Sequence, residues 1–218
     1  IGIGNDTYTN AVARKNLEFA VLASRRLGRV PDPKWSRVAE RLQIPYDSAG
    51  EYHPTYEGAP PETRGSVVPL LAYPLGLPMN ERAKRNDLEA AVGRLLKEGS
   101  GAMMTTTLYP AIAAELGDRA LVDTLLPLSY RTHLRPPFAV LAETPTNDAV
   151  NFLTGAGGFL QQVIFGYTGL RFGETGLRAA FRPVLPSRIT RLVLRNVASR
   201  GRRYDVVVEG DSARFVSR

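Results

Sequence analysis

One carboxylate, Glu143, stands where acid–base chemistry can be done. It follows the apolar run 137–142 and precedes the polar turn 144–148, Thr-Pro-Thr-Asn-Asp. A glycine-rich segment, 154–158, comes next and leads into an apolar run that predicts a helix over 159–165. A carboxylate beside an apolar segment has its proton affinity tuned by burial, and it acts as a base when a water is held next to it. We therefore interpret Glu143 as a candidate general base.

Other polar groups could assist such a carboxylate. His53 and Tyr56 lie in a loop of alternating aromatic and polar residues, 44–58, and such a loop either lines a sugar cleft or simply covers the surface. Arg131 and Arg135 precede the apolar run, where an arginine either orients the Glu143 segment through an ion pair or contacts a substrate.

Glycine-rich segments admit two interpretations here. Thr154 and Gly155 begin the segment 154–158, which precedes the expected helix. Backbone N–H groups at a helix start bind anions or polar ligands. The same glycines also permit a second helix to approach closely, so both a ligand contact and a packing role stay open.

The composition excludes several classes of function. The 218 residues are 44% hydrophobic and 22% charged, which is typical of a globular chain. No run reaches the roughly 20 apolar residues of a membrane helix. The net charge of +7 comes from scattered arginines without interleaved aromatics, so we expect no nucleic-acid partner. With no cysteine and two distant histidines, we expect no metal and no cofactor. Compartment and oligomeric state are not indicated.

Apolar periodicity predicts mainly helices followed by strands. The expected helices span 7–27, 33–42, 67–75, 80–96, 105–116, 119–130 and 159–165. A hairpin is expected around 173–176, and an antiparallel meander over 189–197, 203–208 and 214–216. Helix pairs without a repeated motif favour a closed α/α toroid over a solenoid. We predict a helical domain over residues 1–182 and a β domain over 183–218.

Separated motifs in one order carry a family resemblance. They are GNDTYTN (4–10), EYHPTYEG (51–58), LLAYPL (70–75), NDL (86–88), GAMMT (101–105), AAELGD (113–118), SYRTHLRPPF (129–138), NFLTGAGGFLQ (151–161) and FGYTGLRF (165–172). Together they resemble the C-terminal part of the catalytic domain in glycoside hydrolase family 65. The resemblance is to its hydrolase branch of acid trehalases, kojibiose hydrolases and protein-glucosylgalactosylhydroxylysine glucosidases.

That resemblance implies a fold and a chemistry. The fold would be the second half of an (α/α)6 toroid followed by a small antiparallel β region. The chemistry would be inverting hydrolysis of an α-glucosidic bond, with Glu143 as the base that activates water. Inverting enzymes pair such a base with an acid about 6.5–9.5 Å away. The family's acid motif would lie just before Ile1, so we expect this chain to be the C-terminal portion of a longer protein.

One segment departs from the family pattern. Arg64-Gly65-Ser66-Val67 stands where relatives usually carry Lys-Gln-Ala-Asp, and their Lys-Gln pair lies at the sugar subsite. Arg64 keeps the positive charge, so we expect it to bind substrate together with His53, Tyr56, Thr154 and Gly155. Gly65 supplies no side chain, which predicts an altered substrate preference or activity.

Two alternative functions stay open. A disaccharide phosphorylase uses phosphate in place of water, and a carboxylate at its base position would repel that anion. Glu143 therefore favours hydrolysis, whereas the anion-binding potential of 154–158 keeps phosphorolysis possible. The altered segment at Arg64 would also suit a carbohydrate-binding relative without turnover. In each case the expected partner is an α-glucoside.

Overall fold

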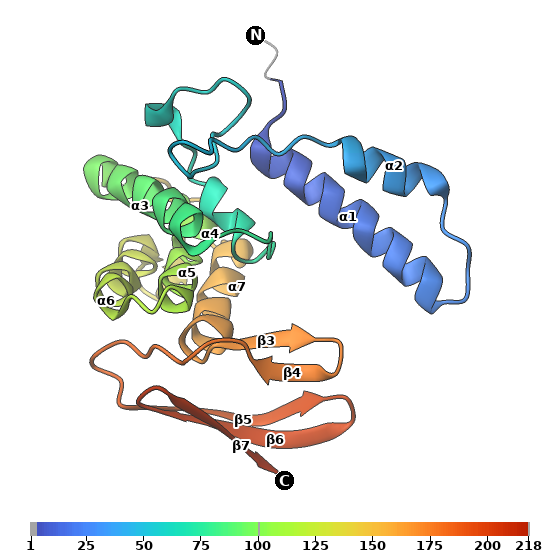
Figure 1. Ribbon diagram of the computed structural model, residues 1–218. Coiled ribbons are helices and arrows are strands. Elements are labelled where there is room, and N and C mark those ends of the chain that lie inside the picture. Colours follow the sequence, from blue (N-terminus) through green and yellow to red (C-terminus); the bar gives the residue numbers. More distant parts are fainter. Residues whose placement is uncertain (1–3, 100, 218) are drawn as a thin grey trace. The chain divides into compact units, whose positions relative to one another are not determined.

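The computed structural model describes residues 4–99 and 101–217, and the chain divides into two compact units, Ile1–Arg94 and Leu95–Arg218. The chain is mainly helical, with small antiparallel sheets toward its C-terminus. Figure 1 shows the helices and strands of both units. Among the described residues, no helix combines the length and apolar character that a membrane crossing requires. The predicted domain boundary at 182/183 stays a prediction.

The first unit opens with a helical hairpin. α1 (Thr7–Arg26) and α2 (Pro33–Arg41) pack against each other as an antiparallel pair. Each helix begins where an aspartate side chain caps it: Asp6 accepts from the Thr9 N–H, and Asp32 accepts from the Lys34 N–H. The predicted helices over 7–27 and 33–42 are thus confirmed to within one or two residues.

The rest of the first unit is mostly loop. It contains the short 3₁₀ helices η1 (Pro61–Thr63) and η2 (Val68–Leu71), and it reaches into helix α3 (Glu81–Glu98). The prediction of a helix over 67–75 was wrong, because only η2 is helical within that range. Pro74 has no N–H and its ring opposes a continuing helix, which explains the early end. The segment is nevertheless buried, with Leu71 fully inaccessible.

The second unit begins with short helices. They are α4 (Met103–Thr106), α5 (Tyr109–Glu115) and α6 (Arg119–Leu128), followed by the 3₁₀ turn η3 (Arg131–His133). One helix was predicted over 105–116, and the structure divides it. Pro110 lies in the first turn of α5, and a proline ring there clashes with the carbonyl four residues earlier. A new helix therefore has to start at Tyr109.

A hairpin and a long helix follow. Strands β1 (Leu134–Arg135) and β2 (Val140–Leu141) pair antiparallel, and α7 (Leu153–Gln161) continues into the π-helical turn η4 (Gln162–Tyr167). The helix starts earlier than the predicted 159, so the glycine-rich segment lies inside it.

The C-terminal strands form two small sheets. β3 (Leu170–Gly173) pairs with β4 (Gly176–Ala179) across the predicted turn. β5 (Arg191–Ser199), β6 (Arg202–Glu209) and β7 (Ser212–Ser217) form the predicted antiparallel meander. Val206, Val207 and Val208 of β6 are all buried. The turn before β7 has Gly210 at φ +62°, a conformation that glycine adopts without strain.

Candidate active site

The backbone at Glu143 is held from three directions. β1 and β2 pair Leu134 with Leu141, which brings the chain after β2 beside η3. The Glu143 N–H donates to the Ala149 carbonyl at 3.0 Å, and its own carbonyl accepts from the Met103 N–H of α4 at 2.7 Å. Just before it, the Ala142 N–H donates to the His133 carbonyl at 2.8 Å. The carboxylate therefore projects from a fixed backbone position rather than from a free loop.

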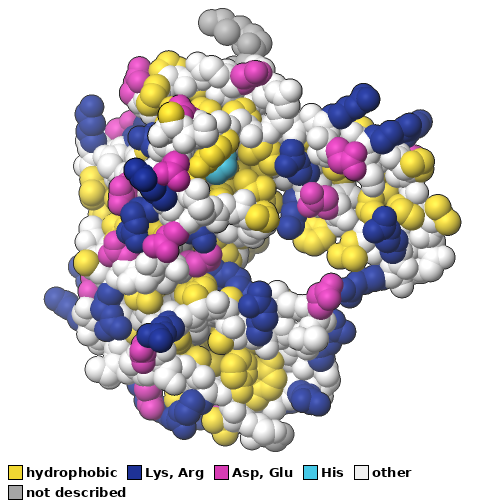
Figure 2. All heavy atoms as spheres, in the orientation of Figure 1, with side chains coloured by type: hydrophobic (Ala, Val, Ile, Leu, Met, Phe, Trp, Pro, Cys, Tyr) yellow, Lys and Arg dark blue, Asp and Glu magenta, His cyan; other side chains and the backbone are white. Residues whose placement is uncertain are grey.

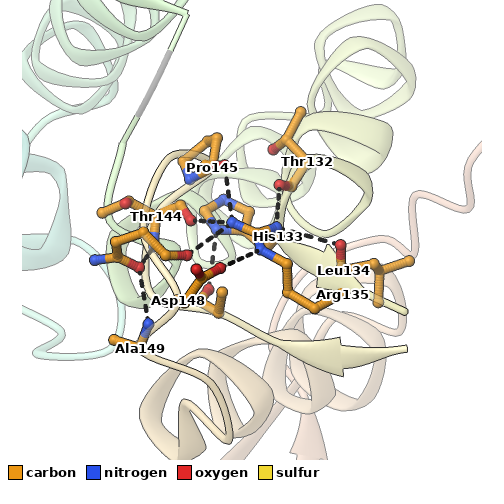
Figure 3. Close-up of polar contacts among 10 residues, drawn as sticks. Thr132, His133, Leu134, Arg135, Thr144, Pro145, Asp148 and Ala149 are labelled. Carbon is orange, nitrogen blue, oxygen red and sulfur yellow. Dashed lines mark hydrogen bonds and ion pairs between the residues drawn. The ribbon is translucent and has the colours of Figure 1, made fainter. Parts of the chain in front are cut away.

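Arg135 lies at the centre of the turn that follows Glu143 (Figure 3). Its Nη2 donates to the carbonyls of Thr144, Pro145 and Asn147 at 2.8–3.0 Å. Its Nη1 donates to the carbonyls of residues 132 and 134 at 3.1 and 3.2 Å. Its Nε lies 3.5 Å from the Asp148 carboxylate, which is itself exposed. Of the two alternatives for this arginine, the contacts support an orienting role.

The Glu143 side chain is half-buried, and its two oxygens differ. Oε2 accepts from the Asn147 amide nitrogen at 3.3 Å. From the described residues of its own unit, Oε1 receives no hydrogen bond. The Asn147 amide is oriented in turn, because its Oδ1 accepts from the N–H groups of Thr144 and Ala149 at 3.3 and 3.4 Å. One carboxylate oxygen is thus anchored, and the other is available for a ligand.

His133 contacts Ala142, the residue directly before Glu143. Its ring is 1% exposed, and Nδ1 lies 3.1 Å from the Ala142 carbonyl. A carbonyl only accepts, so Nδ1 carries the proton in that contact. Burial lowers the pKa of His133, and the Arg135 charge acts in the same direction against the opposing backbone hydrogen bonds. His133 is therefore a neutral structural donor at pH 7.

The glycines of α7 face α4. A Cβ atom at Gly155 would lie 2.7 Å from the Met103 sulfur, and one at Gly158 would clash with the Thr107 hydroxyl. Gly157 faces open space, and Thr154 is exposed near the helix start. These contacts support the packing interpretation of Gly155. The predicted sugar contacts of Thr154 and Gly155 stay predictions.

His53, in the first unit, is held by a carboxylate that the sequence interpretation gave no role. Asp87 of α3 accepts from the His53 ring Nδ1 at 2.7 Å and from the His53 backbone N–H at 2.9 Å. Both residues are buried, and the His53 ring lies against Tyr46 with centroids 5.0 Å apart. Asp87 thus holds the His53 ring in one orientation through its Nδ1–H group.

Arg64 stacks on an aromatic ring of the same unit. Its guanidinium lies 4.7 Å from the Tyr52 ring centroid, and Nε donates to the Pro61 carbonyl at 3.1 Å. A Cβ at Gly65 would meet the Thr55 side chain at 3.1 Å, which accounts for a small residue there. Tyr56 is half-buried. Substrate contacts by these residues stay predictions.

Two residues of these contacts carry no role predicted from the sequence, and a third had two possible roles. Asn147 was noted only as part of a polar turn, Asp87 only as part of a motif, and Arg135 was left between two roles. Asp87 had a detectable signal, since it adjoins Leu88 on the apolar side of the predicted helix 80–96. Asn147 and Arg135 had none, because their contacts depend on how the turn folds back.

The described residues hold no metal cluster, and the face shown in Figure 2 has no basic patch. Residues 4–99 and 101–217 hold no group of three His, Cys, Asp or Glu side chains arranged for a metal ion. On the face shown in Figure 2, Lys and Arg side chains are dispersed among acidic ones. The excess charge is thus spread over this face rather than gathered.

Comparisons with known proteins place these features in a family. A protein-glucosylgalactosylhydroxylysine glucosidase from Danio rerio is 36% identical over 97% of this chain and 32% of its own length. A kojibiose hydrolase from Mucilaginibacter mallensis is 32% identical over 94% of this chain and 30% of its own. A periplasmic acid trehalase from Saccharomyces cerevisiae is 33% identical over 78% of this chain and 15% of its own. No family model matched.

A solved structure has a similar fold. It is named as a kojibiose phosphorylase from the human microbiome, and it matches 99% of this chain and 34% of its own with a TM-score of 0.61. At 12% identity, this likeness concerns the fold alone.

The sequence relatives define a class, the glycosidases that act on glucosylated substrates. The chain is a homologue of the glycoside hydrolase family 65 hydrolases, which confirms the predicted resemblance. The chain spans about a third or less of the length of these curated relatives.

Proposed function

We propose that this chain forms part of an inverting α-glucosidase in which Glu143 is the general base. The observation that carries the proposal is the asymmetry of the Glu143 carboxylate, which has one oxygen anchored by Asn147 and the other open, on a firmly held backbone. The relatives' names support a glucoside as substrate, either a disaccharide or a glucosylated acceptor.

The reaction needs two groups on opposite faces of the sugar. Glu143 would take a proton from a water molecule as the water oxygen bonds to the anomeric carbon. The glycosidic C–O bond breaks, and a carboxylic acid protonates the departing oxygen. We propose that this acid precedes Ile1 in the complete protein, where the family motif would place it. The products are β-glucose and the released acceptor.

The sugar contacts and the toroid belong to the same proposal. His53 would accept a sugar hydroxyl through Nε2, since Asp87 occupies Nδ1. Arg64, Tyr56, Thr154 and Gly155 would complete the subsite. The helix pairs of the two units would form the second half of an (α/α)6 toroid, which the fold likeness to the solved structure supports.

The anomer formed first tests this proposal. The complete protein, carrying this chain and the residues before it, is incubated with kojibiose or trehalose, and the products are followed by proton NMR. We expect the attacked ring to appear first as β-glucose and without added phosphate; from trehalose this gives β-glucose and the released α-glucose in equal initial amounts. Initial release of α-glucose from trehalose without β-glucose would contradict inversion, and glucose 1-phosphate formed only with phosphate would identify a phosphorylase. Sugar binding without products would indicate a non-catalytic relative.

A further inference from the structure

We propose that Arg135 and Asn147 act as positioning residues that set the direction of the Glu143 carboxylate. This inference rests on the proposed role of Glu143 as base. Arg135 hydrogen-bonds the carbonyls of the turn 144–148. Asn147 belongs to that turn and hydrogen-bonds the Glu143 carboxylate.

Arg135 is committed entirely to the protein. A guanidinium has five N–H donors. Here they are directed at five backbone carbonyls and at the Asp148 carboxylate. The side chain is mostly buried, being 19% exposed. No donor remains for a substrate, so any effect on the reaction must act through the turn.

The turn links Arg135 directly to the reacting group. The same Asn147 residue gives its carbonyl to Arg135 and its amide N–H to Glu143 Oε2. Asn147 Oδ1 is fixed by the N–H groups of Thr144 and Ala149. Displacing the Arg135 fork would therefore move the amide and rotate the carboxylate away from a bound water.

Lysine cannot replace this arrangement. Its ammonium is a single point with three donors, whereas Arg135 spans carbonyls on both sides of its fork. Thr144, Pro145 and Asn147 converge on one guanidinium nitrogen, and two earlier carbonyls converge on the other. An Arg135→Lys variant keeps the charge but loses most of these bonds.

The Asn147 amide places no charge beside the carboxylate that we propose as the base. His133 and Arg135 hydrogen-bond the segment 142–147, and Asp148 follows it, while α4 and α7 carry no titratable or charged side chain. An acidic side chain at position 147 would set a second negative charge against Glu143 and raise the pKa of the base. The pH dependence of kcat/KM therefore distinguishes a positioning role of Asn147 from a purely structural one.

The test compares Asn147→Asp with Thr146→Asp in the complete protein, measuring kcat/KM against pH. Aspartate keeps the acceptor oxygen of Asn147, so the turn should form. Thr146 is exposed in the same turn and controls for the added charge. The acidic limb reports the base of the free enzyme. We expect it to move up by about one pH unit in Asn147→Asp and by much less in Thr146→Asp.

A second pair of variants tests the arginine. In Arg135→Lys we expect kcat to fall roughly a hundredfold with KM little changed, as for a misplaced catalytic group. Arg119→Lys is the control, since Arg119 is an exposed arginine at the start of α6 in the same unit.

Two results would overturn the inference. One is an equal shift of the acidic limb of kcat/KM in both aspartate variants, and the other is an equal kcat in both lysine variants. The wild-type product assay separates this failure from failure of the proposed function. If the wild type releases β-glucose without phosphate, the proposed function stands whatever these variants show.

Discussion

Two carboxylates, the buried Asp87 and the half-buried Glu143, differ in how their oxygens are hydrogen-bonded. Asp87 is 2% exposed, and each of its oxygens accepts a short hydrogen bond from His53. Glu143 is half-buried and accepts one longer bond, from Asn147. A carboxylate with both oxygens satisfied and no access to water cannot activate a water molecule. The difference supports a structural role for Asp87 and is consistent with the role as base that we propose for Glu143.

The donors around the two carboxylates differ as well. Asp87 supports a side chain, because it fixes the His53 ring. Glu143 is instead positioned by its neighbours, because Arg135, His133 and Met103 hydrogen-bond the backbone around it. In one case the acid positions its neighbour, and in the other the neighbours position the acid.

Removing the Asp87 carboxylate should have the largest effect on stability. Asp87→Ala leaves the His53 ring and backbone N–H without their acceptor, and we expect it to lower the free energy of unfolding by about 3 kcal/mol. Glu89→Ala, an exposed change on the same helix, should cost under about 0.5 kcal/mol. Urea unfolding measures both. Equal small losses would show that Asp87 is not a structural support.

The α4–α7 contact next to Glu143 should respond to single methyl groups. Gly158→Ala places Cβ against Thr107, so we expect a loss of about 1–3 kcal/mol in unfolding free energy. Gly157→Ala fills open space in the same helix and should stabilise by about 0.5–1 kcal/mol. Thermal or urea unfolding gives the signs. Two changes of the same sign would contradict the packing role assigned to the glycines.

The smallest expected effect is a pH dependence from His133. Burial lowers its pKa in the folded state, so the unfolded chain takes up the proton first as pH falls below about 6.5. The stabilising contribution is complete above that pH and is lost toward pH 5. We expect His133→Gln, which does not titrate, to show a smaller loss between pH 7 and 5. Parallel pH profiles would rule out this contribution.

Much of the fold could be predicted from local patterns, and the site could be predicted only in part. Apolar periodicity located α1, α2 and the meander, because that signal acts within a few residues. The helix expected over 67–75 failed where Pro74 intervened, and the glycines of α7 were placed before the helix rather than in it. Glu143 could be singled out by its flanking segments.

The residues that support Glu143 lay beyond such reasoning. Arg135 reaches carbonyls nine to twelve residues away, and the geometry that allows this comes from the pairing of β1 with β2. Asn147 contacts Glu143 only because the turn closes on itself. Such contacts depend on tertiary structure, which residue spacing does not specify.

The central claim is that Glu143 is the reactive carboxylate, and one comparison tests it most directly. Hydrolysis by the complete protein is measured for Glu143→Gln and for Asp148→Asn, which neutralises an exposed acid in the same turn. We expect Glu143→Gln to lose about 10²–10⁴-fold in kcat with an unchanged melting temperature, and Asp148→Asn to stay close to wild type. Full activity in Glu143→Gln, or an equal loss in both variants, would contradict the assignment.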